Sequence, residues 1–209
     1  MHVVLIVGPF SHRALLALEE KKIPYSKTLV DLDNKPQWLL DINSAGSVPI
    51  IKDIATGEWT VDSGVIVDML EKRFLEPSYG TVEGSPQVGL PIFGAFKEFA
   101  KAETEEEAKE KEAALVAALE ELDTYLQKTN PYIGGDSPCS TDLLIMPRLY
   151  HLKIALKHFR VCVFFFAKNC IVASCMIIRE RTVVETEKLN CFLTRFMWFR
   201  CRIGRFQVI

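Results

Sequence analysis

Hydrophobic and polar positions follow two different periods over the first 73 residues. Apolar or alternating runs at residues 3–7, 25–30, 48–51 and 58–61 predict four strands. Helical spacing at residues 10–22 and 62–73, with a short apolar cluster after Pro36, predicts three intervening helices. In the first of these helices we expect the apolar side chains to face inward, and the Glu-Glu-Lys-Lys run at residues 19–22 to face water.

The element order β-α-β-α-β-β-α is typical of a thioredoxin-like domain, in which parallel crossovers come first and a hairpin closes the sheet. Residues 74–89 are rich in Pro, Gly and Ser and indicate a linker. Helical patterns follow at 90–102, 105–128 and 140–158, with the Glu/Lys run at 103–112 as a solvated face. We therefore expect an α/β thioredoxin-like N-terminal domain at 1–73, a linker at 74–89, a partial all-α C-terminal domain at 90–160 and an atypical tail at 161–209.

Composition divides the chain near Arg160. Residues 161–209 hold eight Lys/Arg and three Asp/Glu, a net charge of +5, whereas the other 17 basic and 24 acidic residues give residues 1–160 a net charge of −7. Of the six cysteines only Cys139 precedes residue 160. The cysteine spacings match no zinc pattern, so we expect neither a metal site nor disulfides. The overall charge of −2 gives no basic field for nucleic acid.

Several short motifs narrow the family. They are Pro9-Phe10-Ser11, the Ala-Leu-Leu-Ala-Leu-Glu-Glu-Lys run at 14–21, Asp-Asn-Lys-Pro-Gln-Trp at 33–38, Gly-x-Val-Pro at 46–49, Asp-Ser-Gly-Val-Ile-Val at 62–67 and Pro-Arg-Leu-Tyr-His-Leu at 147–152. Over about residues 8–160 the chain resembles the plant-type, glutathione-dependent dehydroascorbate reductases of the glutathione transferase superfamily. The resemblance implies a glutathione-transferase fold, glutathione as co-substrate, no permanently bound cofactor, and reduction of dehydroascorbate to ascorbate.

The resemblance also implies a glutathione site. A cis peptide before Pro49 would turn the backbone of Val48 toward glutathione, which would pair with it like an added strand. Asp62 and Ser63 stand at a helix N-terminus, where a backbone N–H suits the γ-glutamyl carboxylate. The alternative interpretation of these two residues is a simple helix cap.

Two further contacts follow from the resemblance alone. Lys35 would oppose the glycine carboxylate of glutathione, and His151 would also contact the ligand. Taken singly, Lys35 is typical of a surface charge, and His151 on an apolar helix face is typical of a core histidine.

The family's nucleophile is missing. Where the resemblance implies a cysteine at the start of the first helix, this chain has Gly8, so we expect the reductase activity to be impaired or absent. The alternative is a non-catalytic glutathione-binding or interaction protein of the glutathione-transferase fold. A thiolate there would reduce dehydroascorbate, become oxidised, form a mixed disulfide with one glutathione and be released by a second. Ser11 cannot carry that redox chemistry, so it is a weak catalytic candidate with a structural alternative in the first helical turn. Cys139, three residues before Asp142, is expected to be structural at a helix start.

The tail from residue 161 does not resemble the family. Its Val-Cys-Val-Phe-Phe-Phe start suggests a translated intron, a membrane-associating segment at 161–178, or a collapsed apolar cover of the helical half. Charged and amide side chains near the middle of 161–178 argue against a spanning helix. No leader segment is recognised at the start of the chain, so we expect a cytosolic protein, or an organellar one if the N-terminus is incomplete. Separately, we expect the protein to be a monomer.

Overall fold

Four strands form one mixed sheet in the computed structural model, which describes residues 1–6, 8–80, 88–129 and 132–158. The strands are β1 (His2–Leu5), β2 (Ser26–Leu29), β3 (Ile50–Lys52) and β4 (Trp59–Val61), in the order β2-β1-β3-β4. All four predicted strands are confirmed. Parallel pairing holds for β1 and β2, but β3 runs antiparallel to β1, so the expectation of more than one parallel crossover is wrong.

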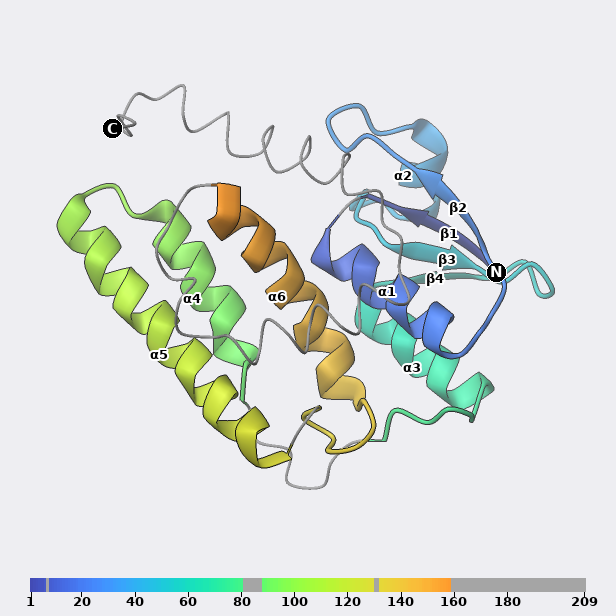
Figure 1. Ribbon diagram of the computed structural model, residues 1–209. Helices are drawn as coiled ribbons and strands as arrows, with labels where there is room; N and C mark the ends of the chain where they lie inside the picture. Colours follow the sequence, from blue (N-terminus) through green and yellow to red (C-terminus); the bar gives the residue numbers. More distant parts are fainter. Residues whose placement is uncertain (7, 81–87, 130–131, 159–209) are drawn as a thin grey trace.

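Helices cover both faces of this sheet because apolar side chains alternate along its central strands. Val3, Leu5 and Ile51 pack against α1 (Pro9–Glu20) and α3 (Ser63–Arg73). Val4 and Ile50 point to the opposite face and pack against Leu39 of α2 (Gln37–Ile42). Figure 1 shows α1 and α3 together on one side of the sheet and α2 on the other. The thioredoxin-like α/β half is therefore present as predicted.

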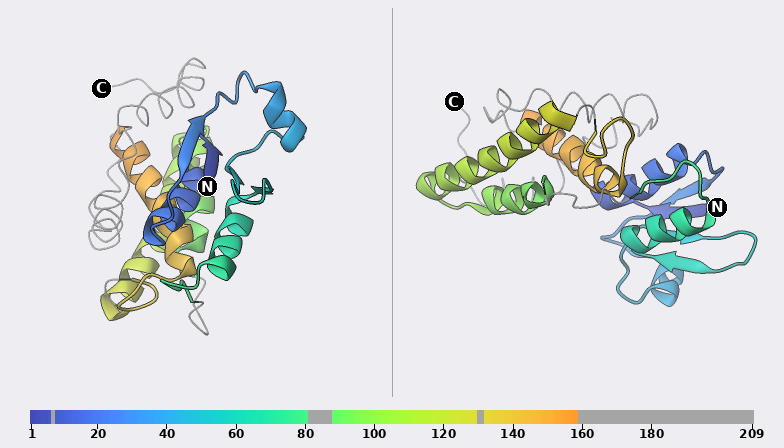
Figure 2. Two further views of the ribbon diagram at one scale, coloured as in Figure 1. Left: turned by 90° about the vertical axis from the view of Figure 1, so that its right-hand side faces the viewer. Right: turned by 90° about the horizontal axis from the view of Figure 1, so that it is seen from below.

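The second half is helical, with α4 (Leu90–Lys101), α5 (Glu105–Thr129) and α6 (Ser140–His158) close to their predicted bounds. α6 packs against α4 on one side and α1 on the other, so it joins the two halves (Figures 1 and 2). Leu143 of α6 accordingly belongs to the core of the α/β half, whereas Leu149 and Leu152 belong to the helical core. Among the described residues no helix is both long and apolar enough to span a membrane, and the expectations for the tail fall outside those residues.

The predicted exposure of the Glu-Glu-Lys-Lys run is wrong at its centre, since Glu20 and Lys21 are each only 7% exposed. The ammonium of Lys21 donates to the carbonyls of Phe74 and Pro77 and pairs with Glu71 at 2.9 Å. It also lies 4.7 Å from the ring centre of Tyr79. The chain that follows α3 therefore folds back over the end of α1 and buries a cation that local periodicity assigns to solvent.

Candidate functional site

Sheet pairing brings the positions singled out from the sequence to one edge of the sheet. Val4 of β1 pairs with Ile50 of β3, and Ile50 pairs with Val61 of β4. β1 therefore ends, β3 begins and β4 ends at the same edge. Gly8 follows β1, Pro49 directly precedes β3 and Asp62 directly follows β4, so the three stand around the start of α1 and α3.

Gly8 is the N-cap of α1, and its carbonyl accepts the first helical hydrogen bond from the His12 N–H at 2.9 Å. Its backbone is extended (φ −177°, ψ 163°), a conformation open to any residue. Among the described residues, its two chain neighbours aside, an added Cβ would meet nothing closer than two side-chain atoms of Ile6 at 3.9 Å. Glycine is therefore not required here, and the position has room for the cysteine that the resemblance implies.

Ser11 lies one turn into α1 and is 2% exposed. Its hydroxyl accepts a long hydrogen bond of 3.4 Å from the N–H of Ile6, at the end of the strand that leads into the helix. This contact favours the structural interpretation of Ser11 over a catalytic one.

The Val48–Pro49 peptide is cis, as expected. Asp62 is confirmed as the N-cap of α3, because its carboxylate accepts from the N–H groups of Gly64 and Val65 at 2.7 and 3.3 Å. The first helical residue is Ser63, whose side chain is buried. These positions have the backbone arrangement on which the implied glutathione contacts depend.

Lys35 is exposed and lies against the loop that leads to Val48. Its ammonium donates to the carbonyl of Ala45 at 3.3 Å. Gly46 has φ +60°, a conformation that favours glycine. An added Cβ would lie 2.7 Å from Cδ of Lys35 and 3.0 Å from Cδ2 of Leu40, so the exposed end of Lys35 would have to move away.

His151 is buried in the contact between α6 and α1, where its ring centre lies 5.7 Å from that of His12. Tyr150 packs edge-on against both rings, at 5.5 Å from His12 and 5.8 Å from His151. Burial lowers the pKa of His12 to about 4. Burial, with repulsion from His12, lowers the pKa of His151 to about 3. Both imidazoles are therefore neutral at pH 7, and the burial of His151 fits the core interpretation.

An aromatic and cationic cluster beside Gly8 escaped sequence reasoning. Phe10 and Phe93 of α4 meet edge-to-face with ring centres 6.1 Å apart. The guanidinium of Arg148 lies over both rings, 5.9 Å from Phe10 and 5.2 Å from Phe93, and Lys97 lies 5.5 Å from Phe93. Two members of this cluster, Phe10 and Arg148, lie in motifs that the sequence analysis singled out. Phe93 and Lys97 belong to α4, which only the fold brings to them.

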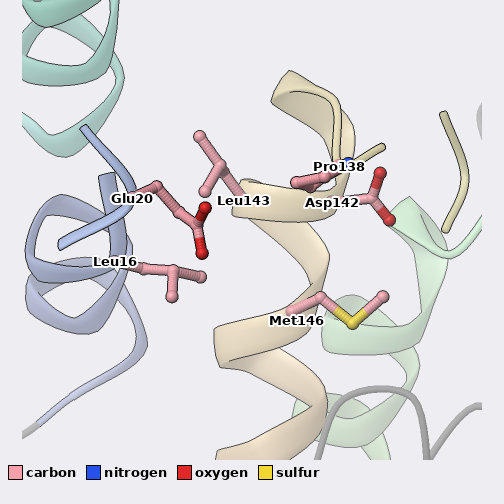
Figure 3. Close-up of a pocket in the computed structure, with 6 residues that line it drawn as sticks. All are labelled: Leu16, Glu20, Pro138, Asp142, Leu143 and Met146. Carbon is pink, nitrogen blue, oxygen red and sulfur yellow. The ribbon is translucent and has the colours of Figure 1, made fainter. Parts of the chain in front are cut away.

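The cavity in Figure 3 is not a substrate site. It lies between α1 and α6, at the opposite end of α1 from Gly8, and its volume is about 10 Å³. That is room for about one water molecule. The carboxylate of Glu20 is directed into the space between the two helices. The residues that line the cavity are mostly apolar: Leu16, Glu20, Pro138, Asp142, Leu143 and Met146.

Cys139 is not part of the site around Gly8, because it stands at the start of α6. It is buried and free, and burial raises the pKa of its thiol. Its backbone N–H donates to Asp142 at 2.9 Å, and the same carboxylate accepts from the N–H of Ile133 at 2.9 Å, so the start of α6 is fixed as a helix cap. Within the described ranges no group of three or more His, Cys, Asp or Glu is placed to hold a metal ion.

Known proteins with the same arrangement identify the family. Residues 7–73 match the glutathione S-transferase N-terminal domain. Glutathione S-transferase DHAR2 of Arabidopsis thaliana is 44% identical over 153 residues, which cover 73% of this chain and 70% of that protein. The chain belongs to the dehydroascorbate reductase family of glutathione transferases. Rice (Oryza sativa subsp. japonica) has a probable cytosolic member, DHAR1, that is 41% identical over 152 residues, with the same two coverages.

A solved structure of this family has the same fold. The crystal structure of Chlamydomonas reinhardtii dehydroascorbate reductase superposes with a TM-score of 0.76 at 33% identity, covering 92% of this chain and 97% of that one. The α/β sheet followed by helices is thus the glutathione-transferase fold.

Proposed function

We propose that this chain binds glutathione as dehydroascorbate reductases do, but does not itself catalyse the reduction of dehydroascorbate. The observation that carries the second part is Gly8 at the N-cap of α1. In the family reaction two electrons pass from two glutathione molecules to dehydroascorbate through one protein sulfur, which yields ascorbate and glutathione disulfide. Glycine offers no atom that can carry them, and Cys139 is buried at a helix start far along the chain.

Binding of glutathione is supported by the cis peptide at Pro49 and by the start of α3. The N–H and C=O of Val48 would pair with the cysteinyl unit, and the N-terminus of α3 at Asp62 and Ser63 would receive the γ-glutamyl carboxylate. Lys35, exposed beside the same loop, would oppose the glycine carboxylate. His151 acts indirectly in this proposal, since it packs on the first turn of α1 through His12.

The helix start at Gly8 still suits sulfur chemistry. Unpaired N–H groups and the helix dipole stabilise an anion there, by about 0.3–1 kcal/mol when exposed. A cysteine at position 8 would therefore have a thiol pKa lowered from its usual value. The described residues around Gly8 leave space for that side chain without a clash.

The test is a dehydroascorbate reduction assay with glutathione, run on the full chain and on Gly8→Cys, and followed by the absorbance of ascorbate. We expect background turnover in the chain itself and enzymatic turnover in Gly8→Cys. Gly8→Ser is the matched control, because it adds a group of similar size without sulfur and should stay inactive. Turnover in the unmodified chain equal to that of Gly8→Cys would refute the proposal.

The same proposal covers partners and location. The ligands are glutathione and dehydroascorbate or ascorbate, the chain acts as a monomer, and the two halves correspond to domains at 1–73 and 90–160. A cytosolic location is supported by the rice relative, which is described as cytosolic. Gel filtration tests whether the chain is a monomer, and a fluorescent fusion tests its location.

A further inference from the structure

One side of α4 carries more aromatic surface than the neighbouring helices bury. Three of its 12 residues are phenylalanines, and none of Phe93, Phe96 and Phe99 is buried, whereas Ile92 is. Phe96 and Phe99 pack against the helical core with only part of their surface. The neighbouring helix α5 is different, since it buries all four of its leucines. Among the described residues, the apolar side of α4 is therefore incompletely covered.

An acidic surface begins where α4 turns into α5. The glutamates there are exposed, and none of them forms an ion pair with a described residue: Glu103, Glu105, Glu106, Glu107 and Glu110. Three of them stand in the first turn of α5, where the helix dipole favours negative charge. Residues 101–112 contain six Glu and three Lys, so this surface keeps a net charge of −3. It would attract a positively charged segment.

The chain leaves the described residues at the same end of the helical half. α6 ends at His158, and Figure 1 shows this end beside the end of α4 and the start of α5. Residues 159–209 continue from there, outside the part of the chain that the structure describes. A chain as long as residues 159–187 spans roughly 30 Å on average. Because α4 is only about 18 Å long, any residue after 187 can reach its whole length.

Residues 188–209, which we name the basic aromatic segment, are complementary to this surface. They contain five Lys or Arg and no Asp or Glu. Lys188, Arg195 and Arg202 recur every seven residues. Large apolar residues recur at alternating spacings of four and three, which places them on one face of a helix with these three cations along its flank: Phe192, Phe196, Phe199, Ile203 and Phe206.

We propose that the basic aromatic segment binds to its own chain, with its phenylalanines on Phe96 and Phe99 and its flanking cations at the acidic start of α5. The tether favours this contact over one with a separate partner. It supplies a roughly millimolar effective concentration, so a contact with a dissociation constant of about 100 μM would be formed in about nine chains of ten. This inference does not depend on glutathione binding.

Two single-tryptophan chains test the orientation of the segment. Both are full-length and carry Trp38→Phe and Trp59→Phe, which leaves Trp198 as the only tryptophan. The first keeps Trp198, on the outer side of the predicted helix. The second carries Trp198→Phe and Phe199→Trp, which moves the indole to the apolar face. Acrylamide should quench the second indole at least about twofold less than the first, because contact with α4 covers it.

Charge reversal tests the surface that the segment contacts. Glu106→Lys/Glu110→Lys, introduced into the chain with the inner indole, should increase quenching to the level of the outer indole, because the segment is then repelled. Arg195→Glu/Arg202→Glu should have the same effect. All four substitutions together should restore the shielding. High salt should weaken the contact in the unmodified charge background, since it screens exposed charges.

Glu120→Lys/Glu121→Lys is the matched control, because it reverses two exposed glutamates farther along the same helix. It should leave the shielding of the inner indole unchanged, and it should not restore shielding when combined with Arg195→Glu/Arg202→Glu. Circular dichroism confirms that each variant is folded.

Equal quenching of the two indoles in the folded chain would overturn this inference. Shielding that survives Glu106→Lys/Glu110→Lys would overturn it too, because the segment would then cover another surface. Shielding that increases with protein concentration would indicate a second copy as the partner. Shielding that requires vesicles of phosphatidylcholine and phosphatidylserine would indicate a membrane, to which basic amphipathic helices also bind. Either of these last results would refute the contact within the chain, and neither bears on the proposed function.

Discussion

The buried histidine pair makes the stability of this fold sensitive to mild acid. His12 and His151 have pKa values lowered to about 4 and about 3, whereas an unfolded chain would titrate them near 6.5. Between these values the unfolded chain binds protons that the folded chain does not, so the free energy of unfolding decreases as the pH falls. Each histidine should contribute a loss of about 2 kcal/mol between pH 7 and pH 5.

Together the two histidines should therefore remove about 4 kcal/mol from a total stability on the order of 5–15 kcal/mol. His12→Gln removes one titrating group and relieves the repulsion that also lowers the pKa of His151. We expect its loss between pH 7 and pH 5 to be about 2 kcal/mol, half that of the unmodified chain. Urea unfolding at the two pH values, followed by circular dichroism, measures both differences.

Tyr150→Phe is the control, because it keeps a ring against both histidines and the tyrosine hydroxyl does not titrate in this range. Its difference between pH 7 and pH 5 should match that of the unmodified chain. Glu71 titrates below this window: burial raises its pKa, but hydrogen bonds, first that from Lys21, outweigh burial and leave its pKa lowered. If His12→Gln loses as much stability as the unmodified chain, the reasoning from burial is wrong.

Three further substitutions test other parts of the fold. Lys21→Met should lower the free energy of unfolding by about 3 kcal/mol, because it leaves Glu71 and two carbonyls without their cation; Lys22→Met, on the exposed neighbour, should change it by less than about 0.5 kcal/mol in the same urea titration. Gly46→Ala should destabilise the chain by more than Gly57→Ala, since both have positive φ but only at Gly46 would an added Cβ lie 3.0 Å from Cδ2 of Leu40 and displace the end of Lys35; equal thermal shifts would contradict these contacts. Asp142→Ala should lower the free energy of unfolding by about 2 kcal/mol by leaving the N–H groups of Ile133 and Cys139 unpaired, and an unchanged melting temperature would show that this cap contributes nothing.

Local patterns predicted the elements well, because each strand and helix here carries its own periodicity and its own start signal. Pro9 and Asp62 stand at the starts of α1 and α3, where the sequence places them. The cis peptide at Pro49 was predicted from the family resemblance, not from the pattern of polar and apolar positions. Periodicity could not give the direction of β3, which depends on pairing across the sheet.

Long-range contacts explain what was missed. Glu20 and Lys21 have the polarity of a solvated helix end, and only the return of the chain after α3 and the packing of α6 bury them. The cluster at Arg148 draws on α1, α4 and α6, which are far apart in the sequence. His12 carried a local signal that was not used: an imidazole inside an otherwise apolar helix face points to a buried contact.

The freedom around position 8 has an evolutionary consequence. Nothing in the described packing depends on the absence of a side chain there, and the extended backbone suits either residue. Glycine codons that end in a pyrimidine differ from cysteine codons in their first base alone. Under the proposed function, a Gly8 codon of that kind would let one point mutation restore redox competence, with no repair needed among the described residues that surround it.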